Sequence, residues 1–169
     1  MKKGLIISDA GPIFSLALVD KLAILESLFE RVFIPKAVWE EITRDETKPF
    51  HQVTFNFFKD KVKEITGRND LTFIMDYGES EAVKLYNEMA ADFLLIDDKK
   101  ARLLAENLGV QCVGTIGILS IAKERGLVSE LRPLFHMFLN NKRYYSIRIL
   151  DEILTKHGEE RLETRHNNG

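Results

Sequence analysis

The sequence is poor in the residues that build covalent links and soft-metal sites. Cys112 is the single cysteine among 169 residues, so no disulfide can form within the chain. It lies in the apolar run 110–113, which predicts a buried, unreactive thiol and fits a reducing, cytoplasmic environment. The four histidines are scattered singly along the chain. A zinc site built from paired Cys and His is therefore not favoured.

Long apolar stretches and nucleotide-binding motifs are also lacking. No run of about 18 uncharged apolar residues occurs, which excludes a membrane-spanning helix. The apolar stretch after the two initial lysines is interrupted at once by Asp9, Gly11 and Pro12, so no secretory signal is expected. Neither GxxxxGK[ST] nor GxGxxG is present, which excludes a P-loop enzyme and a dinucleotide site.

What is present is the composition of one ordinary globular domain. Hydrophobic residues make up 45% and charged residues 30% of the chain. We expect a single domain over residues 1–158, with a core at about 4–125, closing helices at about 129–157 and a frayed tail at 159–169. Residues 1–98 hold 12 Lys and Arg against 18 Asp and Glu, whereas residues 99–169 hold 12 against 8. An acidic centre with a basic rim would suit a polyanionic substrate, although solvated helix faces would produce the same asymmetry.

Hydrophobic periodicity predicts alternating strands and helices. Such alternation implies a mostly parallel sheet covered on both faces, so the fold class is α/β, a three-layer α/β/α domain. No repeat or linker divides the chain. The predicted strands are 5–8, 32–34, 62–65, 93–96 and 110–113, and the predicted helices are 13–29, 35–44, 50–60, 79–91, 98–108, 114–125, 129–141 and 146–157.

Oxygen-bearing side chains follow three of these strands. Asp9 ends the first, Asp97 and Asp98 end the strand 93–96, and Thr115 comes after 110–113. Ligands of open parallel sheets bind beyond the carboxyl ends of the strands, so these residues should meet at one edge. Each also begins a helix, and helix capping is the competing interpretation for any one of them.

Two helical glutamates extend this acidic group. Glu41 lies on the apolar side of its helix, unlike Glu40, which salt-bridge spacing assigns to solvent. Glu79 falls on the inward side of the next helix, although an acid in a first helical turn is also favoured by the helix dipole. Glu81 precedes Lys84 by three residues and is expected to be more exposed. Clustered carboxylates need cations, and hard oxygen ligands suit Mg²⁺ or Mn²⁺.

Five stretches, in this order, resemble a PIN domain, and within that superfamily the single-domain proteins related to VapC-type toxins. The order and spacing carry the resemblance, which covers residues 4 to about 125, and the closing helices resemble those of a less well characterised subgroup. The stretches are IISDAGPIFSLA, VFIPKAVWEEI, YGESEAVKLY, FLLIDDKKARLLAENLGV and GTIGILSIAKERG.

The resemblance implies a set of acids that bind divalent metal and hydrolyse RNA phosphodiester bonds by a two-metal mechanism. Asp9 is the first acid, Glu41 the second and Glu79 the third, where many relatives have Asp; the longer side chain would move or weaken the second metal. Asp97 or Asp98 is the fourth. An Asp98–Arg102 pairing one helical turn apart would favour Asp97 as the ligand.

Further residues extend the site towards RNA. Thr115 resembles an auxiliary hydroxyl of the pocket, and Lys99, Lys100 and Arg102 are positioned to contact the RNA backbone unless they form a plain solvated helix face.

The resemblance also implies a homodimer and inhibition by a small antitoxin protein. Candidate contact surfaces are 13–18 and the aromatic residues at 135, 138, 144 and 145, although core packing is the favoured interpretation for most of these. One alternative is a catalytically weak PIN-like module that binds RNA or protein. Another is a response-regulator-like domain. It is disfavoured because its acidic pair should follow the first strand and a lysine the last, whereas Gly114 stands there.

Overall fold

A computed structural model describes residues 2–162 and divides the chain into two compact units, Met1–Thr115 and Ile116–Gly169. Each unit is described separately below. Of the tail predicted at 159–169, residues 163–169 lie outside the described part. The single-domain organisation over 1–158 stays a prediction.

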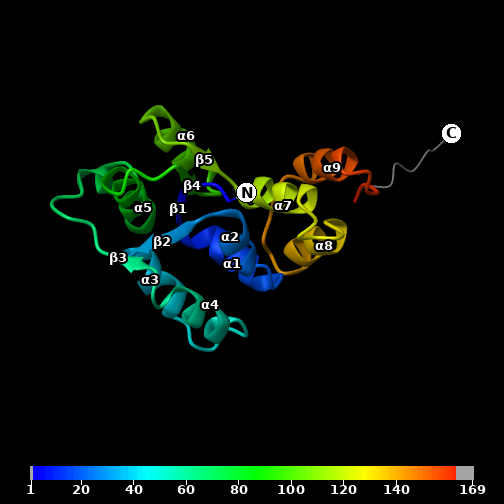
Figure 1. Ribbon diagram of the computed structural model, residues 1–169, viewed down its shortest axis with the longest axis horizontal. Helices are drawn as coiled ribbons and strands as arrows, with labels where there is room; N and C mark the ends of the chain where they lie inside the picture. The colour runs from blue at the N-terminus through cyan, green and yellow to red at the C-terminus, as the bar shows by residue number, and fades with distance from the viewer. Residues whose placement is uncertain (1, 163–169) are drawn as a thin grey trace. The chain divides into compact units, whose positions relative to one another are not determined.

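The first unit is built on a parallel sheet (Figure 1). Its five strands run in the order β3-β2-β1-β4-β5, and every pairing is parallel. Apolar residues dominate the central strand, as expected where helices cover both faces. This confirms the predicted α/β class with its central parallel sheet. The strands are β1 (Leu5–Ser8), β2 (Arg31–Pro35), β3 (Val62–Lys63), β4 (Phe93–Leu95) and β5 (Cys112–Val113).

Side-chain alternation along β1 distributes its residues between the two helical layers. Leu5 and Ile7 belong to a buried cluster that includes Val83 of α5 and Ala105 of α6, whereas Ile6, which is fully buried, faces the opposite layer. The arrangement is the predicted three-layer α/β/α sandwich. The helices of this unit are α1 (Ala10–Leu18), α2 (Ala23–Leu28), α3 (Lys36–Thr43), α4 (His51–Phe58), α5 (Tyr77–Glu88) and α6 (Lys99–Asn107), with a 3₁₀ turn, η1 (Asp70–Phe73).

The single helix predicted over 13–29 is wrong, because the segment forms two helices, α1 and α2. Asp20 adopts a left-handed conformation with φ of 54°, which cannot continue an α-helix. The amide of Lys21 then donates to the carbonyl of Leu16 over 2.8 Å and closes the end of α1. The apolar pattern continues through this break, so periodicity alone did not reveal it.

The register of the sheet places the ends of β1 and β4 side by side. Ser8 pairs with Leu95, and the amide of Asp9 donates to the carbonyl of Leu95 over 2.9 Å. Asp9, directly after β1, and Asp97, two residues after β4, therefore lie at the same edge of the sheet. This is the edge at which the acidic residues were predicted to meet.

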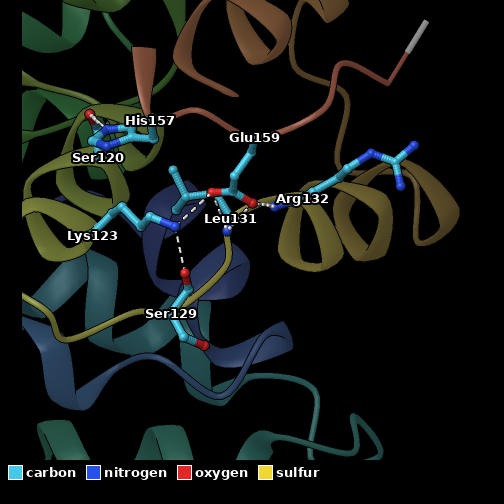
Figure 2. Close-up of polar contacts among 7 residues, drawn as sticks. All are labelled: Ser120, Lys123, Ser129, Leu131, Arg132, His157 and Glu159. Carbon is cyan, nitrogen blue, oxygen red and sulfur yellow. Dashed lines mark hydrogen bonds and ion pairs between the residues drawn. The ribbon is translucent and has the colours of Figure 1, made fainter. Parts of the chain in front are cut away.

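The second unit contains α7 (Thr115–Glu124), which begins at the last residue of the first unit, α8 (Arg132–Asn140) and α9 (Ile147–Lys156). Figure 2 shows Glu159 at the start of α8, where its carboxylate accepts hydrogen bonds from the amides of Leu131 and Arg132 over 2.9–3.0 Å. Lys123 of α7 pairs with the same carboxylate at 3.2 Å. Glu159 therefore caps α8 and joins it to α7.

Most residues considered as contact surfaces are buried. Ile13 and Leu16 of α1 are fully buried, as are Phe135 and Phe138 of α8. Tyr144 is exposed, with 75% of its surface accessible. Core packing is thus confirmed for the apolar side of α1 and for the two phenylalanines. Over the described residues, every helix is too short or too polar to cross a membrane.

Candidate functional site

Asp9 is the buried acid at the centre of the sheet edge. It is only 8% exposed and occupies the N-cap position of α1, yet its side chain makes no capping hydrogen bond. Helix capping, the competing interpretation from the sequence, therefore does not explain this residue.

The pKa of Asp9 is raised to about 7, first of all by burial, against which the backbone amide of Ala10 acts. The negative charges of Glu79, Glu41 and Asp97 raise the pKa further, in that order. Three acids predicted from the sequence therefore lie close enough to Asp9 to act on its charge.

Gly78 lies between two of these carboxylates. A Cβ atom added to Gly78 would lie 3.1 Å from Glu41 Oε2 and 3.8 Å from Asp9 Oδ1. Glu41 is exposed at the rim of the cluster, whereas Asp9 is buried inside it. Because Gly78 has no side chain, the carboxylates of Glu41 and Asp9 have room to face the start of α5.

Glu79 lies in the first turn of α5 and is half-buried. Burial is the main cause of its raised pKa, and the negative charges of Asp98, Asp76 and Glu41 contribute. Sequence reasoning missed Asp76, the N-cap residue of α5. The signal was available, because Asp76 precedes Glu79 by three residues and borders the same helix start.

Asp97 and Asp98 play different parts. Asp97 accepts hydrogen bonds from Thr115, from its amide over 2.8 Å and from its hydroxyl over 2.6 Å. Thr115 is fully buried, so this contact links β4 to the segment that follows β5. Asp98 instead caps α6, where its Oδ1 accepts from the amide of Ala101 over 2.8 Å.

Arg102 does not form the ion pair with Asp98 that was considered from the sequence, judged by the ion pairs of the described residues. Its guanidinium pairs with Glu106 at 3.2 Å. A Cβ atom added to Gly114 would lie 3.1 Å from Arg102 Nη1 and 3.2 Å from Asp97 Oδ1. The guanidinium group of Arg102 therefore lies at the border of the acidic cluster, next to Asp97.

The expectation that Glu81 is exposed is wrong. Glu81 is 5% exposed, and its Oε1 accepts from the amide of Ala37 over 3.1 Å, at the start of α3. A hydrogen bond with Glu81 and its negative charge also raise the pKa of Tyr77. The three-residue spacing to Lys84 could not reveal this role, because the partner lies 44 positions earlier in the chain.

A surface pocket of about 370 Å³ opens beside the cluster. Glu79 and Asp98 form part of its wall, and so does Lys100. Lys99 and Lys100 are both exposed at the start of α6. The positive charges predicted beside the acidic edge are therefore accessible to solvent.

The chemistry of the cluster is that of hard oxygen donors. Two carboxylates about 5 Å apart repel by about 3 kcal/mol at an effective dielectric constant of about 20, so the group favours protons or cations. Carboxylate oxygens without a cysteine or histidine partner suit Mg²⁺ or Mn²⁺. Among the described residues, no three potential ligands already stand in a metal-holding arrangement. The donor types and the charge fit a divalent ion, whose binding would need the carboxylates to turn inward.

Cys112 is not a second reactive centre. Its thiol is partly buried, and burial raises its pKa to about 11, so the thiolate is scarce at neutral pH. The thiol is thus less buried than predicted, and its raised pKa supports the expectation that it is unreactive.

A family model described as a PIN domain matches residues 5–159. No curated protein matches the sequence. Because the matched region spans most of the 169 residues, the chain belongs to the PIN-domain family.

Proposed function

We propose that this chain is a metal-dependent ribonuclease. The observation that carries the proposal is the buried Asp9 carboxylate, whose pKa is raised to about 7 by burial and by surrounding acids. A buried acid with acidic neighbours is unfavourable for stability alone, and perturbed acids of this kind cluster at functional sites. Membership of the PIN-domain family supports nuclease-type activity.

The proposed ligands are Asp9, Glu41, Glu79 and one residue of the Asp97–Asp98 pair. We favour Asp97 because it acts on the charge of Asp9, whereas Asp98 caps α6. When bound, Mg²⁺ or Mn²⁺ would supply a water of lowered pKa and stabilise the charge that develops on the phosphate. Thr115 would orient Asp97 through its two hydrogen bonds, and the buried setting of Asp9 would limit competition from water.

RNA is the proposed substrate. Lys99 and Lys100 are exposed at the start of α6, next to the acidic cluster, where they would contact the phosphate backbone. Arg102 borders Asp97 and would stabilise negative charge close to the scissile phosphate. Contacts of this kind position a nucleic acid without selecting its sequence.

The test is cleavage of single-stranded and structured RNAs with Mn²⁺, Mg²⁺ or EDTA. Adjacent residues of α3 supply a matched pair of variants, since Glu41 faces the cluster and Glu40 is exposed. Wild type and Glu40→Gln should cleave with metal and stop in EDTA. Asp9→Asn and Glu41→Gln should lose at least about 100-fold in rate, the order expected for removing a group that stabilises the transition state.

Equal inactivity of wild type and Asp9→Asn at high enzyme and metal concentrations would contradict the proposal. Metal binding without cleavage would then point to a catalytically weak RNA- or protein-binding module. RNA cleavage that persists in EDTA would exclude the metal-dependent mechanism.

We propose two protein partners on the basis of the resemblance to VapC-type toxins: a small inhibitory antitoxin and a second copy of the chain. A toxin should arrest growth when the wild-type chain is expressed, the Asp9→Asn variant should be harmless, and co-expression of a cognate inhibitor should restore growth.

Light scattering at several protein concentrations measures the molar mass and therefore the oligomeric state. Harmless expression of an active enzyme would exclude the toxin role, and a monomer at every concentration would exclude the homodimer.

A further inference from the structure

We propose that the pocket beside the acidic cluster binds an unpaired nucleobase, with Phe73 as the stacking surface and Lys100 as the contact to the adjacent phosphate. This inference rests on the proposed ribonuclease function and deepens it, because it makes the substrate single-stranded at the site of cleavage. The pocket encloses about 370 Å³ between η1 and the start of α6. Its wall combines Phe73, Ile74, Leu104, Glu79, Asp98 and Lys100.

Phe73 is unusually exposed for its size. The residue is 82% exposed, and the neighbouring Ile74 is 51% exposed. Exposed apolar residues that border a pocket mark binding surfaces more often than isolated ones do. Every nucleobase presents a flat π-face, so an exposed phenyl ring is a sequence-tolerant stacking surface for single strands.

The turn that carries Phe73 is held in place by its own hydrogen bonds. The amides of Ile74 and Met75 both donate to the carbonyl of Leu71 over 3.0 Å. Asn69 ties the start of the turn to α5, because its side-chain amide donates to Ser80 Oγ over 3.0 Å. The buried Met75 anchors the other end. The exposed ring is therefore presented on an ordered support, which lowers the entropic cost of binding.

The charges around the pocket favour a base over a phosphate inside it. Glu79 and Asp98 would repel a phosphate group, whereas a neutral base meets the apolar side of the pocket without that penalty. Lys100 stands at the same wall and is exposed, so it would receive the phosphate next to the bound base. Glu79 also belongs to the acidic cluster around Asp9, so a base in the pocket would bring its own backbone towards the proposed metal ligands.

A duplex cannot satisfy this pocket, because its bases are stacked and paired. Single strands, loops and bulges offer unstacked bases that aromatic side chains can bind. A protein segment is the other class of occupant for an exposed aromatic surface. Continuity with the acidic cluster and the presence of Lys100 favour RNA, and the experiment below separates the two.

The first experiment compares Phe73→Ala, Phe73→Trp and Leu103→Ala. Leu103 is the matched control, because it is 58% exposed on α6 and does not line the pocket. Phe73→Ala should raise KM for single-stranded RNA roughly 5- to 100-fold with little change in kcat, the range for loss of one stacked base. Phe73→Trp should restore KM, and Leu103→Ala should leave it unchanged. An unaltered KM in Phe73→Ala, or an equal rise for a hairpin stem, would overturn the inference.

A direct readout uses fluorescence in the non-cleaving Asp9→Asn background. Trp39 is the single tryptophan, so Trp39→Phe combined with Phe73→Trp leaves one reporter in the pocket. Single-stranded RNA in Mg²⁺ should quench this reporter, and double-stranded RNA of the same sequence should not. Quenching by a purified protein partner but not by RNA would overturn the inference. If wild type cleaves RNA and Phe73→Ala has an unchanged KM, the base-binding pocket is wrong but the proposed ribonuclease function still holds. Absence of cleavage by wild type would instead count against the proposed function itself.

Discussion

Asp9 is a buried acid among other acids. The same burial and negative charge that suit it to bind a cation should make its ionised form destabilising to the fold. Its folded-state pKa of about 7 lies above the ordinary value of 3.8, so between these values the folded state binds more protons than the unfolded state. The contribution of Asp9 to stability is therefore most favourable below about pH 4, becomes unfavourable as pH rises towards 7, and stays unfavourable above that. The loss is at most roughly 4 kcal/mol, because one pKa unit corresponds to about 1.36 kcal/mol.

Asp9→Asn removes this titration. In EDTA at pH 8 the variant should be more stable than wild type by up to roughly 4 kcal/mol, and the two should converge near pH 4. Urea denaturation at pH 4, 6 and 8 measures the difference. A difference between the two proteins that is the same at all three values would show that the charge of Asp9 carries no penalty.

Gly78 offers a second test at the residue scale. In Gly78→Ala the new methyl group would lie 3.1 Å from Glu41 Oε2, and the exposed Glu41 side chain can swing away. Stability should stay the same or rise by up to about 1 kcal/mol, because alanine favours the helix. The rate of RNA cleavage should fall at least tenfold, because Glu41 leaves the cluster. Thermal unfolding measures the stability and an RNA cleavage assay measures the rate. Full activity of Gly78→Ala would show that Glu41 is not part of the site.

The residues that sequence could identify are those whose role follows from position along a strand or helix. Asp9 was identified because it follows the first strand, and its approach to Asp97 follows from the parallel pairing of β1 with β4. Glu81 was misassigned because its partner, the amide of Ala37, is distant in sequence. Periodicity reports which side of a helix a residue occupies, not which other element covers that side.

At the scale of elements, the strands were predicted closely and the helix boundaries less well. The apolar runs at 5–8 and 93–96 correspond to β1 and β4, because buried parallel strands are continuously apolar. The division between α1 and α2 was not predicted, since it depends on the left-handed backbone of Asp20, a residue that carries no strong turn signal alone. Local backbone geometry, not hydrophobic pattern, decides such a break.

Glu159 supports the second unit through the start of α8, and its removal should destabilise the protein. Burial raises the pKa of Glu159, but hydrogen bonds from the amides of Arg132 and Leu131 and from Lys123 lower it overall. Its contribution is therefore present above its ordinary pKa of 4.5 and is lost as pH falls through the lower folded-state value. Glu159→Ala should cost about 1–2 kcal/mol at pH 7, the usual range for a lost helix cap.

The neighbouring Glu160 is exposed and provides the control. Glu160→Ala should leave the free energy of unfolding within about 0.5 kcal/mol of wild type. The deficit of Glu159→Ala should shrink as pH falls below 4.5, because the wild-type carboxylate takes up a proton as pH falls through its lowered folded-state pKa. If the deficit does not change with pH, or if Glu159→Ala and Glu160→Ala lower the free energy of unfolding equally, the Glu159 carboxylate does not stabilise α8 as a charged cap.

At the scale of the molecule, the uneven charge distribution predicts a measurable salt dependence. If Lys99, Lys100 and Arg102 each contact a phosphate of single-stranded RNA, the logarithm of the binding constant should fall with the logarithm of salt concentration with a slope of about −2. Replacing both lysines by alanine should flatten that slope by about 1.4. Anisotropy titrations of the Asp9→Asn variant between 50 and 200 mM salt measure it, and an unaltered slope would assign these lysines to a plain solvated face.

The claim on which the account depends is that the acids around Asp9 form a site for a divalent metal. Titration calorimetry of Mn²⁺ into the whole protein at pH 8 tests it most directly, with Asp9→Asn and Glu40→Gln as variants. The account predicts saturable binding by wild type and Glu40→Gln, and at least tenfold weaker binding by Asp9→Asn. Absence of binding to wild type, or equal binding to Asp9→Asn, would contradict it.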